Sequence, residues 1–325
     1  MTTLATAELP LSTDAPALRL RRTAAAVRVH FTWWGVHRTL TAQQKEEVGD
    51  ACGADARLLS AGKKIIDVRH PSVRKLTSIR SRVVHYWRGL TLPYVEAGVR
   101  LIRQMDVEPF VRSMEGFRHD LVGAEADVDA AYDALKADAR QRLGRLYNPA
   151  DYPPAVRELF SVDWDFPSVE PPSYLMRLSP EVYRQEQERV AQRFEEAIRL
   201  AEEAFVSEFA RLVSHLTERL GGGADGERRV FRDSAVGNLT EFFGRFRDLN
   251  VRSSQDLDRL VERAQELVRG VTPQDLRDDA GLRRHVAAEM AVVQSQLEWM
   301  TVERPRRRLV RAAPSPNGGA DALAH

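Results

Sequence analysis

Residues 178–220 read LSPEVYRQEQERVAQRFEEAIRLAEEAFVSEFARLVSHLTERL, and the expected architecture is arranged around this stretch. It contains no Gly and a single Pro, Pro180, which follows Ser179 in the order typical of a helix start. The glycine run at 221–223 marks the end of the helix. The sequence therefore predicts one helix of about 40 residues, roughly 60 Å long. Its apolar side chains recur at about every eleventh position, which predicts a single stripe that another element must cover.

Residues 107–147 predict a second long helix with an acidic outer face. A Pro-rich connector, residues 148–172, joins the two helices. Because two helices of similar length bury their stripes most simply against each other, we expect an antiparallel hairpin over 105–222. The stripe of this second helix has the roughly seven-residue spacing of a coiled coil, in Met114, Leu121, Val128 and Leu135.

Shorter elements flank the expected hairpin. Alternating apolar and polar residues over 27–36 predict a strand. Residues 63–68 and 99–102 predict two more strands, and 71–89 predicts an amphipathic helix whose outer face is basic. The expected fold class is therefore mainly α, with a long antiparallel, coiled-coil-like hairpin, a small N-terminal α/β element and a compact C-terminal helical part.

This interpretation divides the chain into five regions. Residues 1–17 are expected to be disordered, and 18–104 to form a small basic α/β region. Residues 105–222 form the hairpin with its Pro-rich connector, and 227–303 a C-terminal helical region. Residues 304–325 are expected to be a basic, disordered tail.

The composition excludes some classes of protein. The chain has 325 residues and a formal net charge of +1, which gives no global attraction to nucleic acid or acidic membranes. Its one cysteine, Cys52, excludes an intramolecular disulfide. No apolar run reaches the roughly 20 residues of a membrane span. Residues 1–17 lack the charged start and apolar core of a secretory signal, so we expect a cytoplasmic protein with no membrane contact.

Three short runs stand out in the last third of the chain. They are FRDSAVGNL at 231–239, LNV at 249–251 and LRDD at 276–279, the last followed by Arg283 and Arg284. Together they resemble an uncharacterised family of helical proteins from bacteria, phages and plasmids. Its members are often encoded near AAA+ ATPases of the MoxR/CobS type. The resemblance implies a role in protein assembly and makes an AAA+ ATPase a candidate partner, and it assigns no catalytic residue.

A basic surface between residues 63 and 103 is the main candidate binding site. Basic residues close to aromatic ones are typical of proteins that bind a phosphate backbone and stack bases. Alternatively, this surface pairs with the acidic helix of the chain itself or of another subunit. A basic run in the tail, Arg306, Arg307 and Arg308, is a second candidate. The candidate residues of the main surface are Lys63, Lys64, Arg69, Arg74, Lys75, Arg82, His85, Arg88, Arg100 and Arg103.

The sequence shows no complete catalytic or metal-binding motif. Gly62-Lys63 lacks the rest of a phosphate loop. His30 and His37 are candidates for an acid–base pair across a turn. Weaker candidates are Cys52, the pairs His119–Asp120 and His285–Glu289, and the carboxylates Asp163, Asp165 and Glu170.

We therefore expect no cofactor and no catalytic activity. The preferred interpretation is a structural or adaptor protein that self-associates through its helices or docks on a protein partner. The alternative is a nucleic-acid-binding protein that uses the basic surface between residues 63 and 103.

Overall fold

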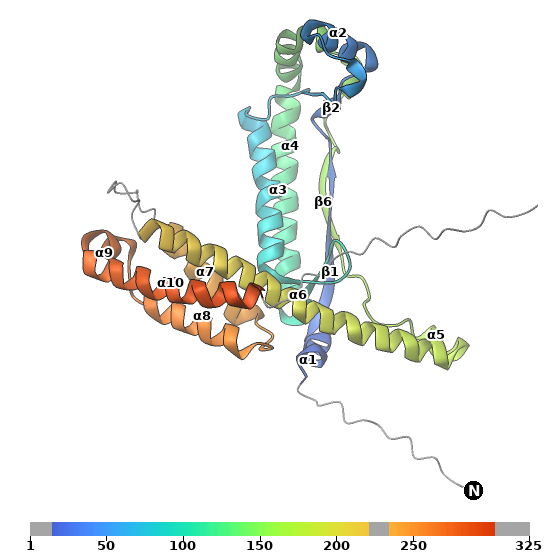
Figure 1. Ribbon diagram of the computed structural model, residues 1–325. Coiled ribbons are helices and arrows are strands. Elements are labelled where there is room, and N and C mark those ends of the chain that lie inside the picture. The colour runs from blue at the N-terminus through green and yellow to red at the C-terminus, as the bar shows by residue number, and fades with distance from the viewer. Residues whose placement is uncertain (1–14, 221–233, 303–325) are drawn as a thin grey trace, which may run out of the picture. The chain divides into compact units, whose positions relative to one another are not determined.

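The computed structural model describes residues 15–220 and 234–302. It confirms that the fold is mainly α (Figure 1). The chain divides into two compact units. The first unit comprises Met1–Phe205 and Glu241–Asp258, and the second comprises Val206–Thr240 and Arg259–His325.

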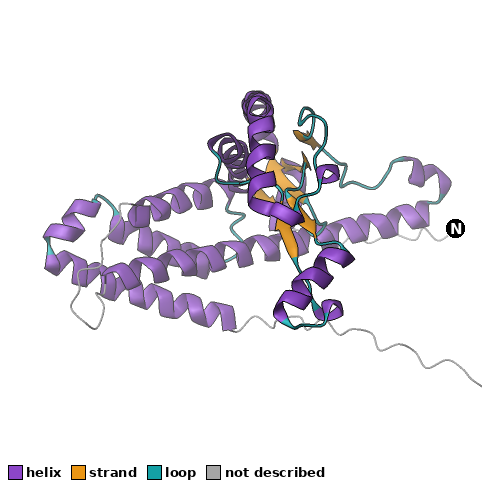
Figure 2. Cartoon of the chain, turned by 90° about the horizontal axis from the view of Figure 1, so that it is seen from above, coloured by secondary structure: helices purple, strands orange, loops and turns teal. Residues whose placement is uncertain are grey.

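A four-stranded antiparallel sheet lies in the first unit (Figure 2). The central strand β1 pairs with β5 through its first half, up to Arg28, and with β6 from Arg28 to its end. The strand predicted over 27–36 therefore exists, although it ends at Trp33, and β6 lies in the connector where no strand is predicted. In spatial order the strands are β4 (Thr91–Pro93), β5 (Val99–Arg103), β1 (Ala24–Trp33) and β6 (Phe160–Asp165).

Short elements surround the two ends of β1. Helix α1 (Pro16–Thr23) leads into the strand, so the disorder predicted for 1–17 is wrong for its last two residues. After β1 the chain forms a small two-stranded sheet from β2 (His37–Thr39) and β3 (Gly62–Lys64). Helix α2 (Ala42–Cys52) lies between these strands and begins with a capping box from Thr41 and Gln44.

Helices α3 (Pro71–Leu90) and α4 (Val107–Leu143) cover one face of the sheet and share one hydrophobic core with it. They run antiparallel, since Lys75 contacts Asp127 whereas Arg82, further along α3, contacts Asp120. The core contains Val73, Leu76, Ile79 and Val83 of α3, Met114, Leu121, Val128 and Leu135 of α4, and Val27, Ile102 and Val162 of the sheet.

The antiparallel hairpin predicted for 105–222 is therefore wrong in its choice of partner. The apolar stripe of α4 is buried against α3 and the sheet, and that core includes no residue of α6 (Pro180–Leu220). Likewise, the boundary predicted at residues 104–105 separates two helices that share a core. The physical reason is that α3 offers an apolar face and a basic flank, which match the stripe and the acidic flank of α4.

Helix α6 begins at Pro180, as the Ser179-Pro180 pair predicts, and is described as far as Leu220. The short helix α5 (Tyr174–Leu178) precedes it. Within the first unit, the ring of Phe194 of α6 lies 5.8 Å from that of Tyr94, which follows β4. Further along α6, Phe205 packs edge-on against Phe246 of α7 (Ser234–Leu249), with ring centroids 5.1 Å apart.

The second unit is helical, as predicted for the C-terminal part. Besides parts of α6 and α7, it contains most of α8 (Gln255–Val268), α9 (Pro273–Asp278) and α10 (Ala280–Val302). Arg263 of α8 forms an ion pair of 2.7 Å with Glu289 of α10. No helix within 15–220 or 234–302 combines the length and apolarity needed to cross a membrane. The core of this unit includes Phe209, Val213, Leu216, Leu239, Val261, Ala264, Leu276, Val286, Met290, Val293 and Leu297.

Candidate interaction surfaces

Helices α3 and α4 face each other with opposite charges along one flank. The Nζ of Lys75 lies 2.6 Å from Oδ2 of Asp127, and an Nη of Arg82 lies 3.2 Å from Oδ2 of Asp120. All four side chains are about half exposed, so each pair contributes at most about 1 kcal/mol to stability. For Lys75 and Arg82, the geometry thus supports the alternative interpretation, in which the basic surface pairs with the protein's own acidic helix.

Lys63 is buried, in contrast to its predicted place on a binding surface. Its side chain is 4% exposed, and its Nζ lies 2.8 Å from Oδ2 of Asp151. The same ammonium donates a hydrogen bond of 2.6 Å to the carbonyl oxygen of Leu146. Lys63 therefore joins β3 to the segment that follows α4, and it is not available to an external ligand.

Three further basic residues are also engaged within the fold. Arg69 binds Asp67 through Nε at 3.2 Å. Arg103 donates from Nε to Asp106 at 2.5 Å. The guanidinium of Arg100 donates to the hydroxyl and carbonyl oxygens of Thr91 at 2.6 and 2.8 Å. Burial, followed by the charges of Arg88 and Arg245, lowers the pKa of Arg100 to about 10.

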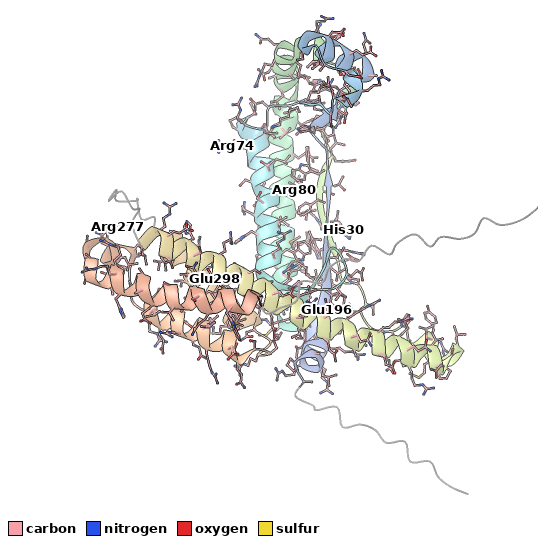
Figure 3. The ribbon with its side chains drawn as sticks, in the orientation of Figure 1. His30, Arg74, Arg80, Glu196, Arg277 and Glu298 are labelled. Carbon is pink, nitrogen blue, oxygen red and sulfur yellow. The ribbon has the colours of Figure 1, made fainter. Side chains whose placement is uncertain are left out.

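Four predicted residues retain an exposed cationic or titratable group. His85 lies 3.4 Å from Glu241, with both side chains largely exposed. Lys64, Arg74 and Arg88 make no ion pair with any other residue in the described ranges. Figure 3 marks Arg74 on α3. The candidates Arg306, Arg307 and Arg308 lie outside the described residues. The structure therefore does not bring the ten candidates together as one open surface.

We predict that Asp67 links the segment before α3 to the end of α4 in a pH-dependent way. Arg69 and Arg142 donate hydrogen bonds that hold the pKa of this carboxyl well below its usual value of 3.8. A carboxyl whose pKa falls on folding stabilises the folded state above its unfolded pKa, and this contribution is lost at lower pH. Asp67→Asn should thus lower Tm at pH 7, and the difference from wild type should shrink below about pH 4. Melting curves measured by circular dichroism across this pH range test the prediction.

The matched control is Asp133→Asn, because the Asp133 side chain is 96% exposed in its pair with Lys136. This substitution should change Tm little at any pH. A Tm difference for Asp67→Asn that stays constant from pH 7 to about pH 3 would contradict the assigned role of Asp67.

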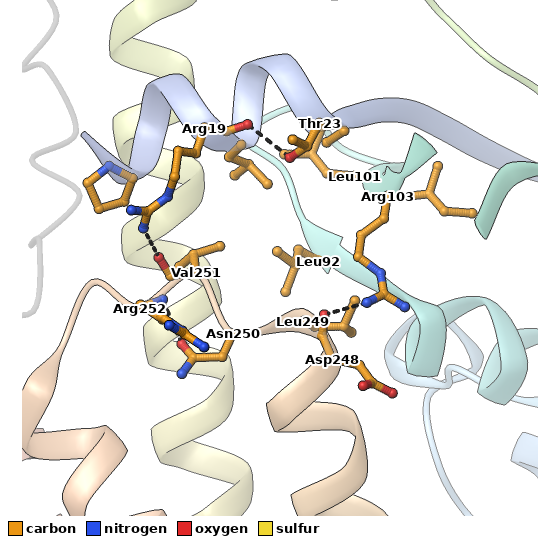
Figure 4. Close-up of a pocket in the computed structure, with 14 residues that line it drawn as sticks. Arg19, Thr23, Leu92, Leu101, Arg103, Asp248, Leu249, Asn250, Val251 and Arg252 are labelled. Carbon is orange, nitrogen blue, oxygen red and sulfur yellow. Dashed lines mark hydrogen bonds between the residues drawn. The ribbon is translucent and has the colours of Figure 1, made fainter. Parts of the chain in front are cut away.

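A pocket of about 390 Å³ lies between α1, β5 and the loop that follows α7 (Figure 4). Arg19 donates to the carbonyl oxygen of Val251 at 2.9 Å, and Arg103 donates to that of Asp248 at 2.8 Å. The backbone of Arg252 is left-handed, with φ of 52°, and its N–H donates to the Asn250 side chain at 2.8 Å. The LNV run at 249–251 therefore spans the end of α7 and the start of the loop after it, which Arg19 of α1 and Arg103 of β5 hold in place.

The other sequence candidates do not converge on a catalytic centre. His30 lies on β1 with Nε2 3.1 Å from Oδ1 of Asp165, on the exposed face of the sheet (Figure 3). His37 belongs to β2 in the other sheet, and no hydrogen bond links its side chain to His30 in the part of the chain that the structure describes. Cys52 is exposed at the end of α2. Over the described ranges, no group of three His, Cys, Asp or Glu side chains is placed to hold a metal ion.

The remaining weak candidates have separate places in the fold. Asp163 pairs with Arg118 of α4 at 3.0 Å. Glu170 binds the guanidinium of Arg21 through a two-oxygen contact that lowers the pKa of Glu170. His119 lines a shallow groove between α3 and α4 together with Lys75 and Arg82. Glu289 pairs with Arg263, and His285 is an exposed residue of α10.

The structure shows one surface that the sequence interpretation missed. Four large apolar side chains are exposed on α5 and the first turn of α6: Tyr174 at 53%, Met176 at 52%, Leu178 at 74% and Val182 at 41%. We call these four residues the α5–α6 surface. The available signal was their position, because Tyr174, Met176 and Leu178 precede the helix start at Ser179-Pro180 and cannot belong to the stripe of α6.

Comparison of the chain with models of protein families, with curated proteins and with solved structures found no match. The resemblance to the helical family of bacterial, phage and plasmid proteins therefore stays a prediction.

Proposed function

We propose that this protein is a non-enzymatic adaptor that docks on another protein, or on a second copy of itself, through the α5–α6 surface. The observation that carries the proposal is the exposure of Tyr174, Met176, Leu178 and Val182 within nine consecutive positions, 174–182. Exposed apolar side chains that are scattered singly are common on soluble proteins. Side chains gathered on one short segment are instead typical of an interaction site.

The helix that carries this surface is already formed. The first buried residue of α6 is Val190, and every earlier residue of the helix is exposed or half-buried. These first turns are supported by ion pairs along the helix, Arg184 with Glu181 at 2.5 Å and Arg189 with Glu186. A preformed helix loses little conformational entropy on binding, which suits docking into a groove of a partner.

The free energies of side-chain burial and of association indicate which part of an interface the α5–α6 surface can supply. Full burial of one Leu, Met or Val side chain contributes about 1.5–3 kcal/mol. Two proteins that associate lose roughly 4–15 kcal/mol in translational and rotational freedom. The α5–α6 surface therefore supplies the anchoring contacts of an interface, and the exposed polar face of α6 supplies the rim. An AAA+ ATPase is a candidate partner on the family resemblance alone.

The double variant Met176→Glu, Leu178→Glu tests the proposal. We expect it to abolish the assembly that wild-type protein forms, because two charges would have to be buried at the centre of the interface. Light scattering after size exclusion reports a homo-oligomer, and affinity purification from the native host reports a different protein partner. The matched control is Gln187→Glu, Gln192→Glu, which adds the same charge at exposed polar positions of α6. The proposal is wrong if both variants keep the wild-type assembly, or if wild-type protein forms none.

Nucleic-acid binding is the second candidate function, and Lys64, Arg74 and Arg88 are the observation that favours it. Three phosphate contacts would give a slope of about −2.7 in a plot of log affinity against log salt for duplex DNA. A titration of labelled duplex at several salt concentrations measures this slope. A steeper slope, or binding that survives Arg74→Glu, Arg88→Glu, would require contacts outside these residues.

A further inference from the structure

Strands β1 and β6 each have one edge that faces away from the other strand. These two edges differ in whether their backbone N–H and C=O groups form hydrogen bonds. The N–H of Trp34 donates to the carbonyl oxygen of Leu159 at 3.1 Å, so these residues form a hydrogen-bonded pair just beyond the last pair of the β1–β6 ladder, Trp33 with Phe160. In an antiparallel ladder such pairs alternate. The backbone groups of His30 and Thr32 therefore point towards β6, and those of Phe31 and Trp33 point to the opposite edge.

Side chains of α4 cover the outer edge of β6. Glu125 accepts hydrogen bonds from the backbone N–H groups of Leu159 and Phe160 at 3.1 and 3.3 Å. Arg118 donates to the carbonyl oxygen of Val162 at 3.4 Å, and its guanidinium lies 4.3 Å from the centre of the Trp164 ring. Charged side chains placed in this way protect an edge strand from pairing with another chain.

No described side chain covers the opposite edge of β1 in this way. Strand β5 pairs with β1 only as far as Arg28. Within 15–220 and 234–302, no backbone or side-chain group bonds to the N–H or C=O groups of Phe31 and Trp33 on this side. Both residues are half-buried, whereas His30 and Thr32 between them are exposed. An edge of this kind is a template for a further strand.

Arg80 gives this edge its charge. It is the one basic residue on the otherwise apolar face of α3. Its guanidinium lies 4.8 Å from the centre of the Trp33 ring and 5.2 Å from that of Phe31. Arg80 forms no ion pair with any other described residue. Figure 3 marks Arg80 on α3 and His30 on β1.

We propose that the free edge of β1 at Phe31 and Trp33 binds an extended, acidic segment of another protein as an added strand. The backbone of that segment pairs with Phe31 and Trp33, and an acidic side chain on the face towards α3 binds Arg80. This inference extends the proposed adaptor function to a second surface, and it does not depend on the α5–α6 surface.

A second copy of this chain is the less suitable occupant. Two β1 edges paired around a twofold axis near Phe31 would bring the Arg80 side chains of both copies close together. Neither guanidinium has a carboxylate in the described part of the chain to offset the repulsion. A segment that supplies its own carboxylate removes this cost, so charge complementarity selects an acidic partner.

The first test is amide hydrogen exchange of the full chain. In the free protein, the amides of Phe31 and Trp33 should exchange faster than those of His30 and Thr32, which pair with β6. A labelled peptide in which valine and glutamate alternate should then slow exchange at Phe31 and Trp33. Equal protection of all four amides in the free protein, or no added protection at saturating peptide, would overturn the proposal.

Two variants and further probes distinguish the pairing of an added strand from nonspecific electrostatic attraction. Arg80→Glu should weaken binding of the valine–glutamate peptide by roughly tenfold or more, as expected for loss of one charge-assisted contact. Arg57→Glu, at an arginine whose side chain is 91% exposed and belongs to neither proposed binding set, should leave the affinity within about twofold. A peptide with methylated backbone nitrogens, or one that alternates valine and lysine, should not bind. Binding of the methylated peptide, or equal protection by duplex DNA, would contradict an added strand.

The outcome is independent of the α5–α6 surface. The variant Met176→Glu, Leu178→Glu should bind the valine–glutamate peptide as wild-type protein does. If that variant loses its assembly but keeps peptide binding, both proposals hold. If it keeps both, only docking through the α5–α6 surface is wrong, and if wild-type protein never binds the peptide, only the added strand is wrong.

Discussion

Replacement of Asp151 by alanine is expected to lower the free energy of unfolding by about 3 kcal/mol. The substitution leaves the ammonium of Lys63, whose side chain is 4% exposed, without its carboxylate partner. Removing one member of a buried ion pair costs more than the pair contributes, because the remaining charge stays desolvated. The carbonyl oxygen of Leu146 still accepts from Lys63 at 2.6 Å, so we expect the lower part of the usual range. Urea denaturation followed by circular dichroism measures the change.

Two further variants make this prediction specific. Asp127→Ala breaks the exposed pair with Lys75 and should cost less than about 1 kcal/mol. Lys63→Met combined with Asp151→Leu replaces the buried pair by apolar side chains and should recover most of the lost stability. Equal effects of Asp151→Ala and Asp127→Ala would show that Lys63 is hydrated in solution, and they would return it to the set of exposed basic residues.

The second large effect is expected for Phe110→Ala, at about 3–5 kcal/mol. Phe110 is 0% exposed and stacks on Tyr86 of α3 with an interplanar angle of 8° and a centroid distance of 6.0 Å. Its truncation leaves a cavity between α3 and α4 that the packed neighbours cannot fill completely. Val122→Ala on the same helix is the control, since Val122 is 60% exposed and should change stability by less than about 0.5 kcal/mol.

A double-mutant cycle then tests which helix covers the stripe of α4. Truncations of Phe110 and Tyr86 should couple by about 0.5–1.5 kcal/mol, as expected for an aromatic pair. Truncations of Phe110 and Phe194 of α6 should add without coupling, within about 0.5 kcal/mol. Coupling of Phe110 with Phe194 instead would favour the hairpin of α4 and α6 and contradict the shared core of α3 and α4.

Local signals in the sequence predicted the elements of this fold well. The Ser179-Pro180 pair predicted the start of α6, and the alternation after Val27 predicted most of β1. Both patterns act over a few residues, so they are visible without knowledge of tertiary contacts. The choice of partner was not visible, because α4 and α6 match in length whereas the true partner of α4 is the shorter helix α3.

The candidate binding residues were harder to predict than the helices and strands, because their surroundings also depend on tertiary contacts. Lys63 resembles any exposed lysine in the sequence, and only the distant Asp151 makes its burial tolerable. The free edge of β1 depends on where β5 stops pairing, which no sequence pattern reports. Arg80 was the visible signal for that edge, since it alone interrupts the apolar face of α3, but its stacking on Phe31 and Trp33 requires the fold.

Site-specific photo-crosslinking measures docking through the α5–α6 surface most directly. A photoreactive residue in place of Met176, in the full chain expressed in its native host, should give a discrete adduct of higher mass after irradiation. Mass spectrometry of the adduct identifies a second copy of the chain or a different protein. The adduct should disappear when Leu178→Glu and Val182→Glu are added. An adduct pattern no different from that of the same photoreactive residue at the exposed position Gln274 would contradict the proposed adaptor function.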